Sequence, residues 1–252
     1  MFGHKGIFTG IEITQDSQSG IEMPVRFYRS EMFISYFEAD LEPLLALMPH
    51  PRIHPIRRGH HQSVVAVIQT FCNHASIPPY QSVALAIPVT LGKWPAPAYL
   101  PLLFEESWFN KGFYIHREAV NSSEAYEART ELWGFPEFLA EIKTQMTNAR
   151  FQETEVNEEE RIMALRVRRP QYVKEFPKDI KFYSVKQNIV CECVMRIEAS
   201  QDSSLDANSS QIVFGKHPLG RQFQDIVSNP FALETRYMLD MKAVCSYPTY
   251  LD

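Results

Sequence analysis

The sequence is poor in glycine, with 10 among its 252 residues. No G-x-G-x-x-G and no Walker pattern can be drawn from them, so the Gly-rich loops that hold nucleotide phosphates are excluded. A G-x-S-x-G nucleophile elbow is also missing. Ser/His/Asp and Cys/His arrangements stay open, because their members can lie far apart in a chain, although no local pattern supports one.

Cysteines are few, and long apolar runs are missing. Four cysteines occur, and residues 1–9 have no apolar stretch behind them that would indicate a signal peptide. In a chain of this length, four cysteines are more typical of reduced thiols than of a disulfide framework. No apolar run approaches the roughly 20 residues that span a bilayer. We therefore expect a cytoplasmic protein with no membrane partner.

The sequence also lacks a basic stripe. Its net charge is −5, with acidic and basic residues interspersed. Arg52, Arg57 and Arg58 form the nearest basic run, which is more typical of a solvated loop than of a nucleic-acid interface. We expect no nucleic-acid partner.

Alternating apolar residues dominate the rest of the sequence, whose 45% hydrophobic and 12% aromatic residues are typical of a globular protein. A period of two predicts β-strands. It occurs at Ile189, Cys191, Cys193, Met195 and Ile197, at Leu239, Met241, Ala243, Cys245 and Tyr247, and at Phe138, Ala140, Ile142 and Met146.

Two further runs, Val64 to Phe71 and Val83 to Leu91, are almost continuously apolar and predict buried strands. Pro88 interrupts the second run, which predicts an edge strand or a bulge there.

Helix signals are scarce. Asp40 could cap a helix over Leu41 to Met48, and Leu219 to Val227 could form another. Asn157 to Glu160 lies between two alternating segments and predicts a hairpin. Closely spaced strands with a few short helices predict a mostly antiparallel β protein of the α+β type, a barrel or sandwich.

Three local clusters admit a functional and a structural interpretation. Trp94 to Asn110 is too apolar for a solvated loop, so it is irregular core, a lid or a subunit interface. The histidines of the next cluster lie in a flexible basic loop, where spacing alone is weak evidence for a metal. Cys191 and Cys193 share a strand face, but no matching pair completes a zinc site, which favours core packing. The histidines are His50, His54, His60 and His61.

The most informative stretch runs from Gly112 to Ile142 and reads GFYIHREAVNSSEAYEARTELWGFPEFLAEI. It resembles the acetoacetate decarboxylases, which have a G-x-Y-x-H-like strand, a short acidic turn and an R-E-L-x-x-[FY]-P-K segment. The match has no gap from Gly112 to Pro136. Weaker similar pieces follow in the right order, and together they cover the chain from about Pro24. They are Phe33 to Pro49, Ala86-Ile87-Pro88-Val89, Phe182 to Lys186 and Phe214 to Pro218.

The resemblance implies one domain over residues 1–252, with residues 1–23 as an N-terminal extension and residues 94–110 as an apolar insertion. It implies a β-barrel or cone with a funnel-shaped, largely apolar pocket for a small carbonyl or carboxylate ligand such as an oxo acid. It also implies a homo-oligomer. We expect no cofactor and no metal.

The family forms a Schiff base between a 3-oxo acid and the lysine that follows its F-P pair, but here Glu137 follows Phe135-Pro136. A carboxylate cannot form an imine. Lys143 lies further along a predicted strand, on the outer side. By the same resemblance, the family's pocket glutamates map to Val67 and Ser82. The ligand-binding candidates are Arg29, Tyr80, Ser82, His116, Arg129, Glu131, Trp133, Phe135 and Phe138.

Three interpretations of Glu137 follow. It is an acid or base for lyase or isomerase chemistry, a group in a non-catalytic ligand-binding pocket, or a hydrogen-bonding residue of a turn. Burial in an apolar pocket would raise its pKa, while pairing with Arg129 or His116 would oppose that shift. A charged pair would suit ligand anchoring, and a neutral carboxyl would suit proton donation.

Overall fold

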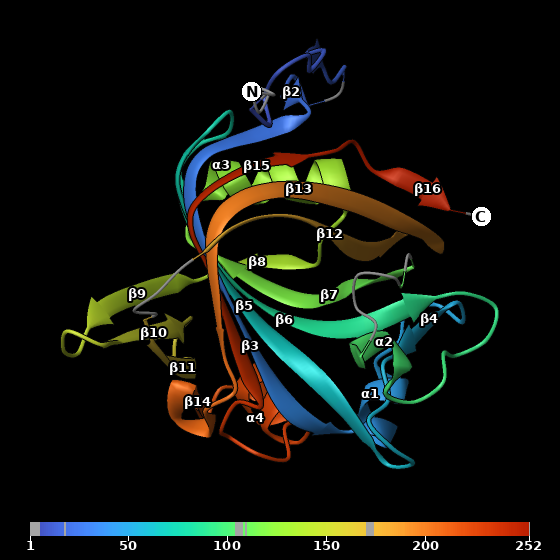
Figure 1. Cartoon of the computed structure of the whole chain (residues 1–252), viewed down its shortest axis with the longest axis vertical. Coiled ribbons are helices and arrows are strands. Elements are labelled where there is room, and N and C mark those ends of the chain that lie inside the picture. Colours follow the sequence, from blue (N-terminus) through green and yellow to red (C-terminus); the bar gives the residue numbers. More distant parts are fainter. Residues whose placement is uncertain (1–5, 18, 104–107, 109, 170–173, 252) are drawn as a thin grey trace.

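Seven strands close into a barrel in the computed structural model, which describes residues 6–251 apart from 18, 104–107, 109 and 170–173. The order around the barrel is β6-β5-β3-β15-β13-β12-β7, and pairing between β6 and β7 closes it (Figure 1). These strands are β3 (Val25–Asp40), β5 (Gln62–Ala75), β6 (Tyr80–Leu91), β7 (Lys111–Val120), β12 (Lys174–Lys186), β13 (Ile189–Ser204) and β15 (Glu234–Cys245).

Most pairings are antiparallel, as the alternation predicts, but β7 pairs with β12 in parallel. Gly112 allows this contact, because a Cβ there would lie 2.6 Å from the backbone oxygen of Lys181. Short strands extend the sheet: β4 (Ile53–Pro55) on β6, β8 (Glu137–Leu139) parallel to β7, and β16 (Thr249–Leu251) on β13. A separate hairpin is formed by β1 (Thr14–Gln15) and β2 (Glu22–Met23).

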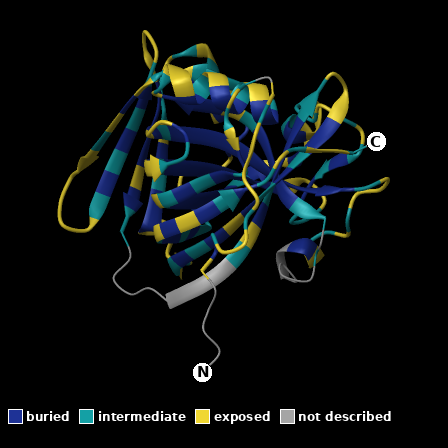
Figure 2. Cartoon of the chain, turned by 90° about the horizontal axis from the view of Figure 1, so that it is seen from above, coloured by how far each residue is buried: buried dark blue, intermediate teal, exposed yellow. Residues whose placement is uncertain are grey.

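A second, four-stranded sheet in the order β14-β11-β10-β9 packs against the outside of the barrel. It contains the predicted hairpin around Asn157 to Glu160. The described residues form two apolar clusters, one inside the barrel and one between the barrel and this sheet. Figure 2 shows buried residues, in dark blue, along the barrel strands. Both faces of β6 are therefore buried, which explains its nearly continuous apolar run. The strands of the second sheet are β9 (Glu141–Met146), β10 (Phe151–Asn157), β11 (Arg161–Arg168) and β14 (Ser210–Phe214).

Helices are short: α1 (Leu41–Ala46), α2 (Leu100–Leu103), α3 (Ser123–Trp133), α4 (Pro218–Gln224) and a 3-10 turn at Ala207–Ser209. The two expected helices are present as α1 and α4, with earlier ends than predicted. A further helix, α3, lies before Gly134, where no helix was predicted from the sequence. Ser122 caps α3 by accepting from the backbone N–H of Ala125, and Gly134 ends it with a φ of 62°.

Three strand predictions need correction. The expected strand over Phe138 to Met146 breaks at Ala140, where the chain leaves the barrel for the second sheet. Leu239 was predicted to share a face with Met241, but the register shifts between Met238 and Met241, so Leu239 packs in the outer cluster. Pro88 lies neither in an edge strand nor at a bulge. It lies between the segment of β6 that pairs with β5 and the segment that pairs with β4.

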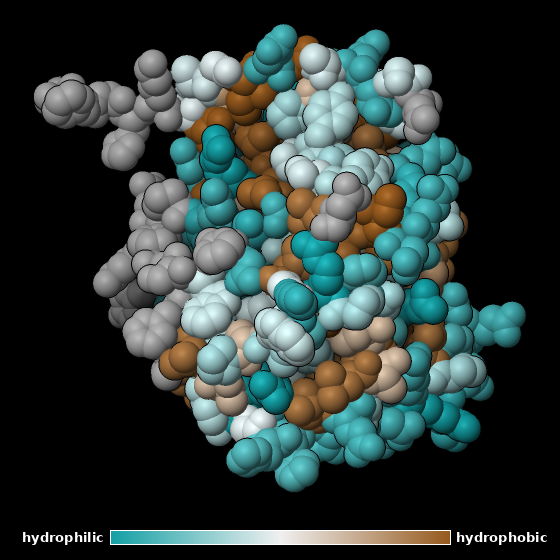
Figure 3. Space-filling view, turned by 90° about the vertical axis from the view of Figure 1, so that its right-hand side faces the viewer, coloured by the Kyte–Doolittle hydropathy of each residue, from teal (hydrophilic) through white to brown (hydrophobic). Residues whose placement is uncertain are grey.

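Several large apolar side chains are exposed on the side of the molecule that carries α1 and α2. Trp94 is 75% exposed, and Leu45, Tyr99 and Leu100 are also exposed. Figure 3 views this side and shows apolar patches among polar ones. Trp94 is therefore not core. Part of the apolar segment, including residues 104–107 and 109, falls outside the described residues. No helix of the described chain is long and apolar enough to cross a membrane.

Candidate functional site

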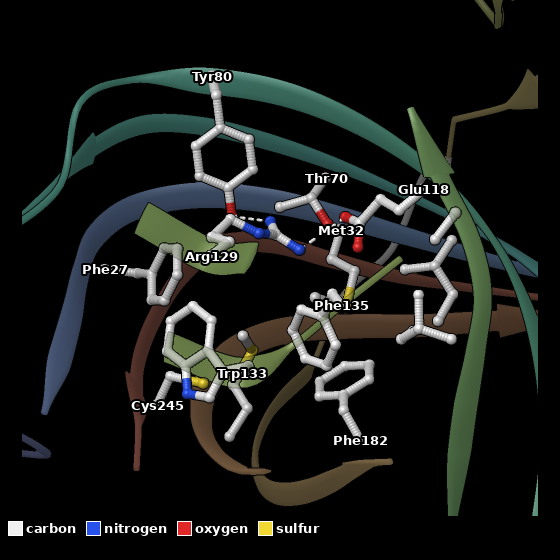
Figure 4. A pocket seen from close by; sticks show the side chains of 14 residues that line it. Phe27, Met32, Thr70, Tyr80, Glu118, Arg129, Trp133, Phe135, Phe182 and Cys245 are labelled. Atoms are coloured by element: carbon white, nitrogen blue, oxygen red, sulfur yellow. Dashed lines mark hydrogen bonds and ion pairs between the residues drawn. The ribbon is translucent and has the colours of Figure 1, made fainter. Parts of the chain in front are cut away.

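A pocket opens inside the barrel, between β-strands that supply apolar side chains and α3, which supplies a cation. Its cavity has a volume of about 30 Å³. One buried water needs roughly 10–15 Å³, so the cavity suits a ligand of a few non-hydrogen atoms. The lining residues are Phe27, Met32, Ile68, Thr70, Tyr80, Ala84, Ile115, Glu118, Arg129, Trp133, Phe135, Phe182, Met195 and Cys245 (Figure 4).

Arg129 is the centre of the polar end of this pocket. Its Nη1 donates to the Tyr80 hydroxyl at 2.5 Å, and its Nη2 donates to the Glu118 carboxylate at 2.7 Å (Figure 4). Its Nε donates to the Glu137 carboxylate, also at 2.7 Å. The guanidinium carbon lies 4.9 Å from the centre of the Tyr80 ring and 5.6 Å from that of Phe135, which adds cation–π attraction.

The chain brings the two carboxyl groups together through backbone pairing. Gly134 turns the chain at the end of α3, so that β8 begins at Glu137 and runs parallel to β7. Glu118 and Glu137 are direct neighbours in this parallel pair. Like charges side by side repel, and Arg129 between them offsets that repulsion.

A β-bulge in β7 aims Glu118 into the barrel. Ala86 pairs with Ile115 and Leu85 pairs with Arg117, so His116 is an extra residue in β7. Phe113 and Ile115 face the interior before the bulge, and Val120 faces it afterwards. Strict alternation would have turned Glu118 outward; the extra residue reverses the alternation and places its carboxylate in the pocket.

Glu137 is fully buried, and its charge is disfavoured. The side chain has no exposed surface, and its second oxygen, Oε2, has no hydrogen-bond partner among the described residues. Burial raises the pKa of Glu137 to about 8, assisted by the Glu118 charge and opposed by Arg129. The carboxyl is therefore mostly neutral at pH 7. Glu137 lies behind Arg129 and does not line the cavity.

Four of the candidates, Tyr80, Arg129, Trp133 and Phe135, line the pocket. Trp133 is fixed there by a hydrogen bond of 2.9 Å from its Nε1 to the Ser246 carbonyl. Ser82 is buried and pairs in register with the pocket residue Thr70, but it does not line the cavity.

The other candidates lie elsewhere. Arg29 is exposed at an irregularity of β3. Glu131 is exposed because it is two positions from Arg129 on α3, and such residues do not share a helix face. His116 and Phe138 lie outside the barrel, where His116 packs near Phe223 of α4 and Phe138 joins the outer cluster. Burial lowers the pKa of His116 to about 4, so it is neutral at pH 7.

Glu118 is a charged residue of the pocket lining that sequence reasoning missed. It lies inside the Gly112 to Ile142 stretch, but no periodic signal marks it, since the bulge that turns it inward depends on pairing with β6. Val67, to which the resemblance assigned a pocket glutamate, belongs to the outer cluster. Lysine is not among the described residues that line the cavity. Lys143 is 64% exposed and paired with Glu141.

Metal ligation has no geometric support here. No group of three or more histidine, cysteine, aspartate or glutamate side chains in the described part of the chain could hold a metal ion. The described histidine-rich loop of residues 50–61 contains no such group.

Comparison with solved structures identifies the fold. The chain superposes on acetoacetate decarboxylase from Legionella pneumophila subsp. pneumophila str. Philadelphia 1 with a TM-score of 0.63 and 13% identity, over 91% of this chain and 87% of that one. The enduracididine biosynthesis enzyme MppR, complexed with pyruvate, gives 0.59 and 10%, over 91% and 90%. An acetoacetate decarboxylase-like enzyme from Sphingomonas wittichii RW1 gives 0.51 and 13%, over 90% and 93%.

No protein-family model matches the sequence. No curated protein matches it either. At these identities the superpositions establish the architecture, in agreement with the resemblance seen in the sequence. The chain has the fold of the acetoacetate decarboxylases, with Glu137 at the position that follows the Phe135-Pro136 pair.

Proposed function

We propose that the barrel pocket binds a small oxo acid or a related carbonyl compound and transfers a proton on it, in a lyase or isomerase type of reaction that forms no Schiff base. The observation that carries this proposal is the polar end of the cavity, where Glu118 and Arg129 lie at one end of a largely apolar lining and Glu137 supports Arg129 from behind. MppR, which has the same fold, is complexed with pyruvate, a small oxo acid.

Arg129 supplies the electrophile. A guanidinium has five N–H groups, and the three hydrogen bonds of Arg129 described above use one on each nitrogen. Nη1 and Nη2 each keep a second N–H for a carbonyl oxygen of the ligand. Hydrogen bonds to that oxygen stabilise the negative charge that develops when a neighbouring carbon loses a proton.

Glu118 supplies the base, because its carboxylate faces the cavity. Glu137 is a positioning residue, because it accepts a hydrogen bond from Nε of Arg129. Its ionisation also sets the net charge of the cluster formed by Glu118, Arg129 and Glu137. With Glu137 neutral, Arg129 and Glu118 cancel, and an anionic oxo acid meets no net repulsion. With Glu137 ionised, the cluster has one excess negative charge, which disfavours an anion and leaves a neutral ketone unaffected.

Solvent deuterium exchange tests this proposal. We would follow the methyl hydrogens of pyruvate and of acetone by proton NMR in deuterated buffer, with wild type, Glu118→Gln and Glu137→Gln. We expect the wild type to accelerate the exchange of both compounds. The exchange rate with Glu118→Gln should be at least ten-fold lower than with the wild type. Glu137→Gln should change mainly the pH dependence of the exchange rate with pyruvate. The exposed Glu141 provides the matched control, Glu141→Gln. Exchange that is insensitive to Glu118 would refute the role of this carboxylate.

A second candidate function is non-catalytic binding of the same ligands. The observation that favours it is the closed polar network, in which each nitrogen of Arg129 already has a protein acceptor. Calorimetric binding of pyruvate or acetone without any accelerated exchange would support this candidate. The absence of both binding and exchange would refute both functions for these two ligands.

Assembly is part of the proposal. The exposed Trp94, Tyr99 and Leu100 next to α2 support a homo-oligomer that covers this side. Sedimentation velocity at micromolar concentration should show a species larger than the monomer. Trp94→Asp should lower the fraction of protein in that larger species. A wild-type monomer would contradict the assembly. We keep the cytoplasm as the proposed location and a small molecule, without nucleic acid or membrane, as the proposed partner.

A further inference from the structure

Two thiols meet in the wall of the pocket. Cys193 on β13 and Cys245 at the end of β15 have Sγ atoms 2.7 Å apart, and both side chains are buried. A disulfide bond is about 2.05 Å long, so a movement of about 0.7 Å would join the two sulfurs. Both cysteines are free thiols in the structure.

The strands are already fixed in a geometry that suits a cross-link. Met195 pairs in register with Cys245, and the backbone N–H of Ser246 donates to the Val194 carbonyl at 2.9 Å. The Ser246 hydroxyl accepts from the backbone N–H of Val194 at 3.1 Å. These contacts hold the two strands together directly beside the thiols, so that a bond between the sulfurs requires no change of register.

Cys245 lines the cavity, whereas Cys193 lies behind it. We propose that Cys193 and Cys245 form an oxidisable dithiol site, which a small hydroperoxide that enters the pocket converts into an intramolecular disulfide. The cavity of about 30 Å³ suits hydrogen peroxide, which has two non-hydrogen atoms. The proposal concerns the pocket wall and does not require the proton-transfer function.

The reaction balances with one peroxide and two thiols. The Cys245 sulfur attacks one peroxide oxygen, an S–O bond forms as the O–O bond breaks, and a sulfenic acid and one water result. The Cys193 sulfur then attacks the sulfenic sulfur; the S–S bond forms, the S–O bond breaks, and hydroxide leaves with the thiol proton as a second water. Two sulfurs are oxidised by two electrons in total, and the peroxide is reduced.

The surroundings assign the two roles. Burial raises the pKa of the Cys193 thiol, and the nearby Arg129 charge only partly opposes this. Cys245 lines the cavity and therefore meets the peroxide first, whereas Cys193 lies behind it and reacts second, with the sulfenic acid of Cys245. The other two cysteines differ: the Cys191 thiol donates to the carbonyl of Ile189, at 3.8 Å, and Cys72 lies on β5. Neither forms a hydrogen bond with another cysteine among the described residues.

The test treats reduced, folded protein with hydrogen peroxide, removes the peroxide with catalase, and unfolds the protein in urea with N-ethylmaleimide. We expect the wild type to lose two hydrogens and to label two of its four cysteines. Digestion should give a cross-linked peptide pair that contains Cys193 and Cys245. Because the bond joins residues 52 positions apart, the oxidised protein should also have a higher Tm.

Cys191→Ser is the matched control from the same strand, and it should form the same cross-link. Cys193→Ser and Cys245→Ser should not lose two hydrogens. If Cys245→Ser fails to fold, Cys193→Ala provides the same test. Four labelled cysteines in the treated wild type would overturn the proposal. So would a sulfinic acid on Cys245 without a cross-link, or a cross-link through Cys72 or Cys191.

Discussion

Replacing Glu137 with glutamine should remove a pH dependence of stability that the wild type shows. The pKa of Glu137 is raised to about 8 in the folded protein, while an unfolded glutamate titrates near 4.5. Between these values the folded state binds the proton and the unfolded state does not. The free energy of unfolding contributed by Glu137 is therefore fully present below about pH 4.5 and is lost as the pH rises through about 8.

The magnitude follows from the same shift. One pKa unit corresponds to about 1.4 kcal/mol, so the wild type should lose up to about 1.4 kcal/mol for each pH unit within this window, relative to the mutant. The glutamine keeps a carbonyl oxygen that can accept from Arg129 Nε, so the contact that is 2.7 Å in the wild type can persist. The mutant isolates the titration from the loss of a hydrogen bond.

Urea unfolding at pH 5.5, 6.5, 7.5 and 8.5 measures this difference, with the fluorescence of the buried Trp133 as one contribution to the signal. Glu141→Gln is the control, because Glu141 is an exposed glutamate on β9 with Lys143 as its partner. It should keep the wild-type slope. If Glu137→Gln and wild type have parallel profiles from pH 5.5 to 8.5, Glu137 titrates as an ordinary glutamate and the burial argument is refuted.

Three other substitutions or reactions test the site and the fold. Arg129→Met should lower the free energy of unfolding by about 3–5 kcal/mol in urea titrations, because it leaves the buried carboxyl groups of Glu118 and Glu137 without their cation; an unchanged midpoint would contradict this. Gly112→Ala should lower the free energy of unfolding by about 1–3 kcal/mol in the same assay, because its Cβ would lie 2.6 Å from the Lys181 backbone oxygen. Gly92→Ala is the control and should lower the free energy of unfolding by less, because the atom nearest to its Cβ would be 3.6 Å away. Borohydride with acetoacetate should leave the intact mass unchanged, since the described pocket lining has no lysine; a stable adduct, at Lys143 or Lys186 for example, would show that a Schiff base forms.

Much of the fold was predictable because the spacing of apolar residues and the signals for chain reversal are local properties of the sequence. The buried strands Gln62–Ala75 and Tyr80–Leu91 and the hairpin around Asn157 to Glu160 follow from patterns within a few residues. α3 was predictable in principle, since Ser122 and Gly134 are an N-cap and a C′ glycine at the right spacing.

The candidate site was predictable only where one segment supplies the residues. Arg129, Trp133 and Phe135 come from α3 and the turn after it, and all three line the pocket. Tyr80 was also among the candidates, through the resemblance. The pairing partner of Glu137, by contrast, depends on the parallel register of β7 and β8, which no local pattern encodes.

Glu118 shows most clearly why the chemistry of this pocket depends on tertiary structure. A single extra residue at His116 reverses the side-chain alternation of β7, so one hydrogen-bonding irregularity against β6 decides whether this carboxylate faces the second sheet or the cavity. The carboxylate in the cavity then lies beside Glu137, and two adjacent carboxyl groups with one arginine cannot both ionise without leaving an excess charge in a buried site. Burial is the larger cause of the raised pKa of Glu137, and the Glu118 charge that the β7 bulge places beside it adds to the shift. The protonation of this pair of carboxyl groups therefore depends in part on a backbone feature.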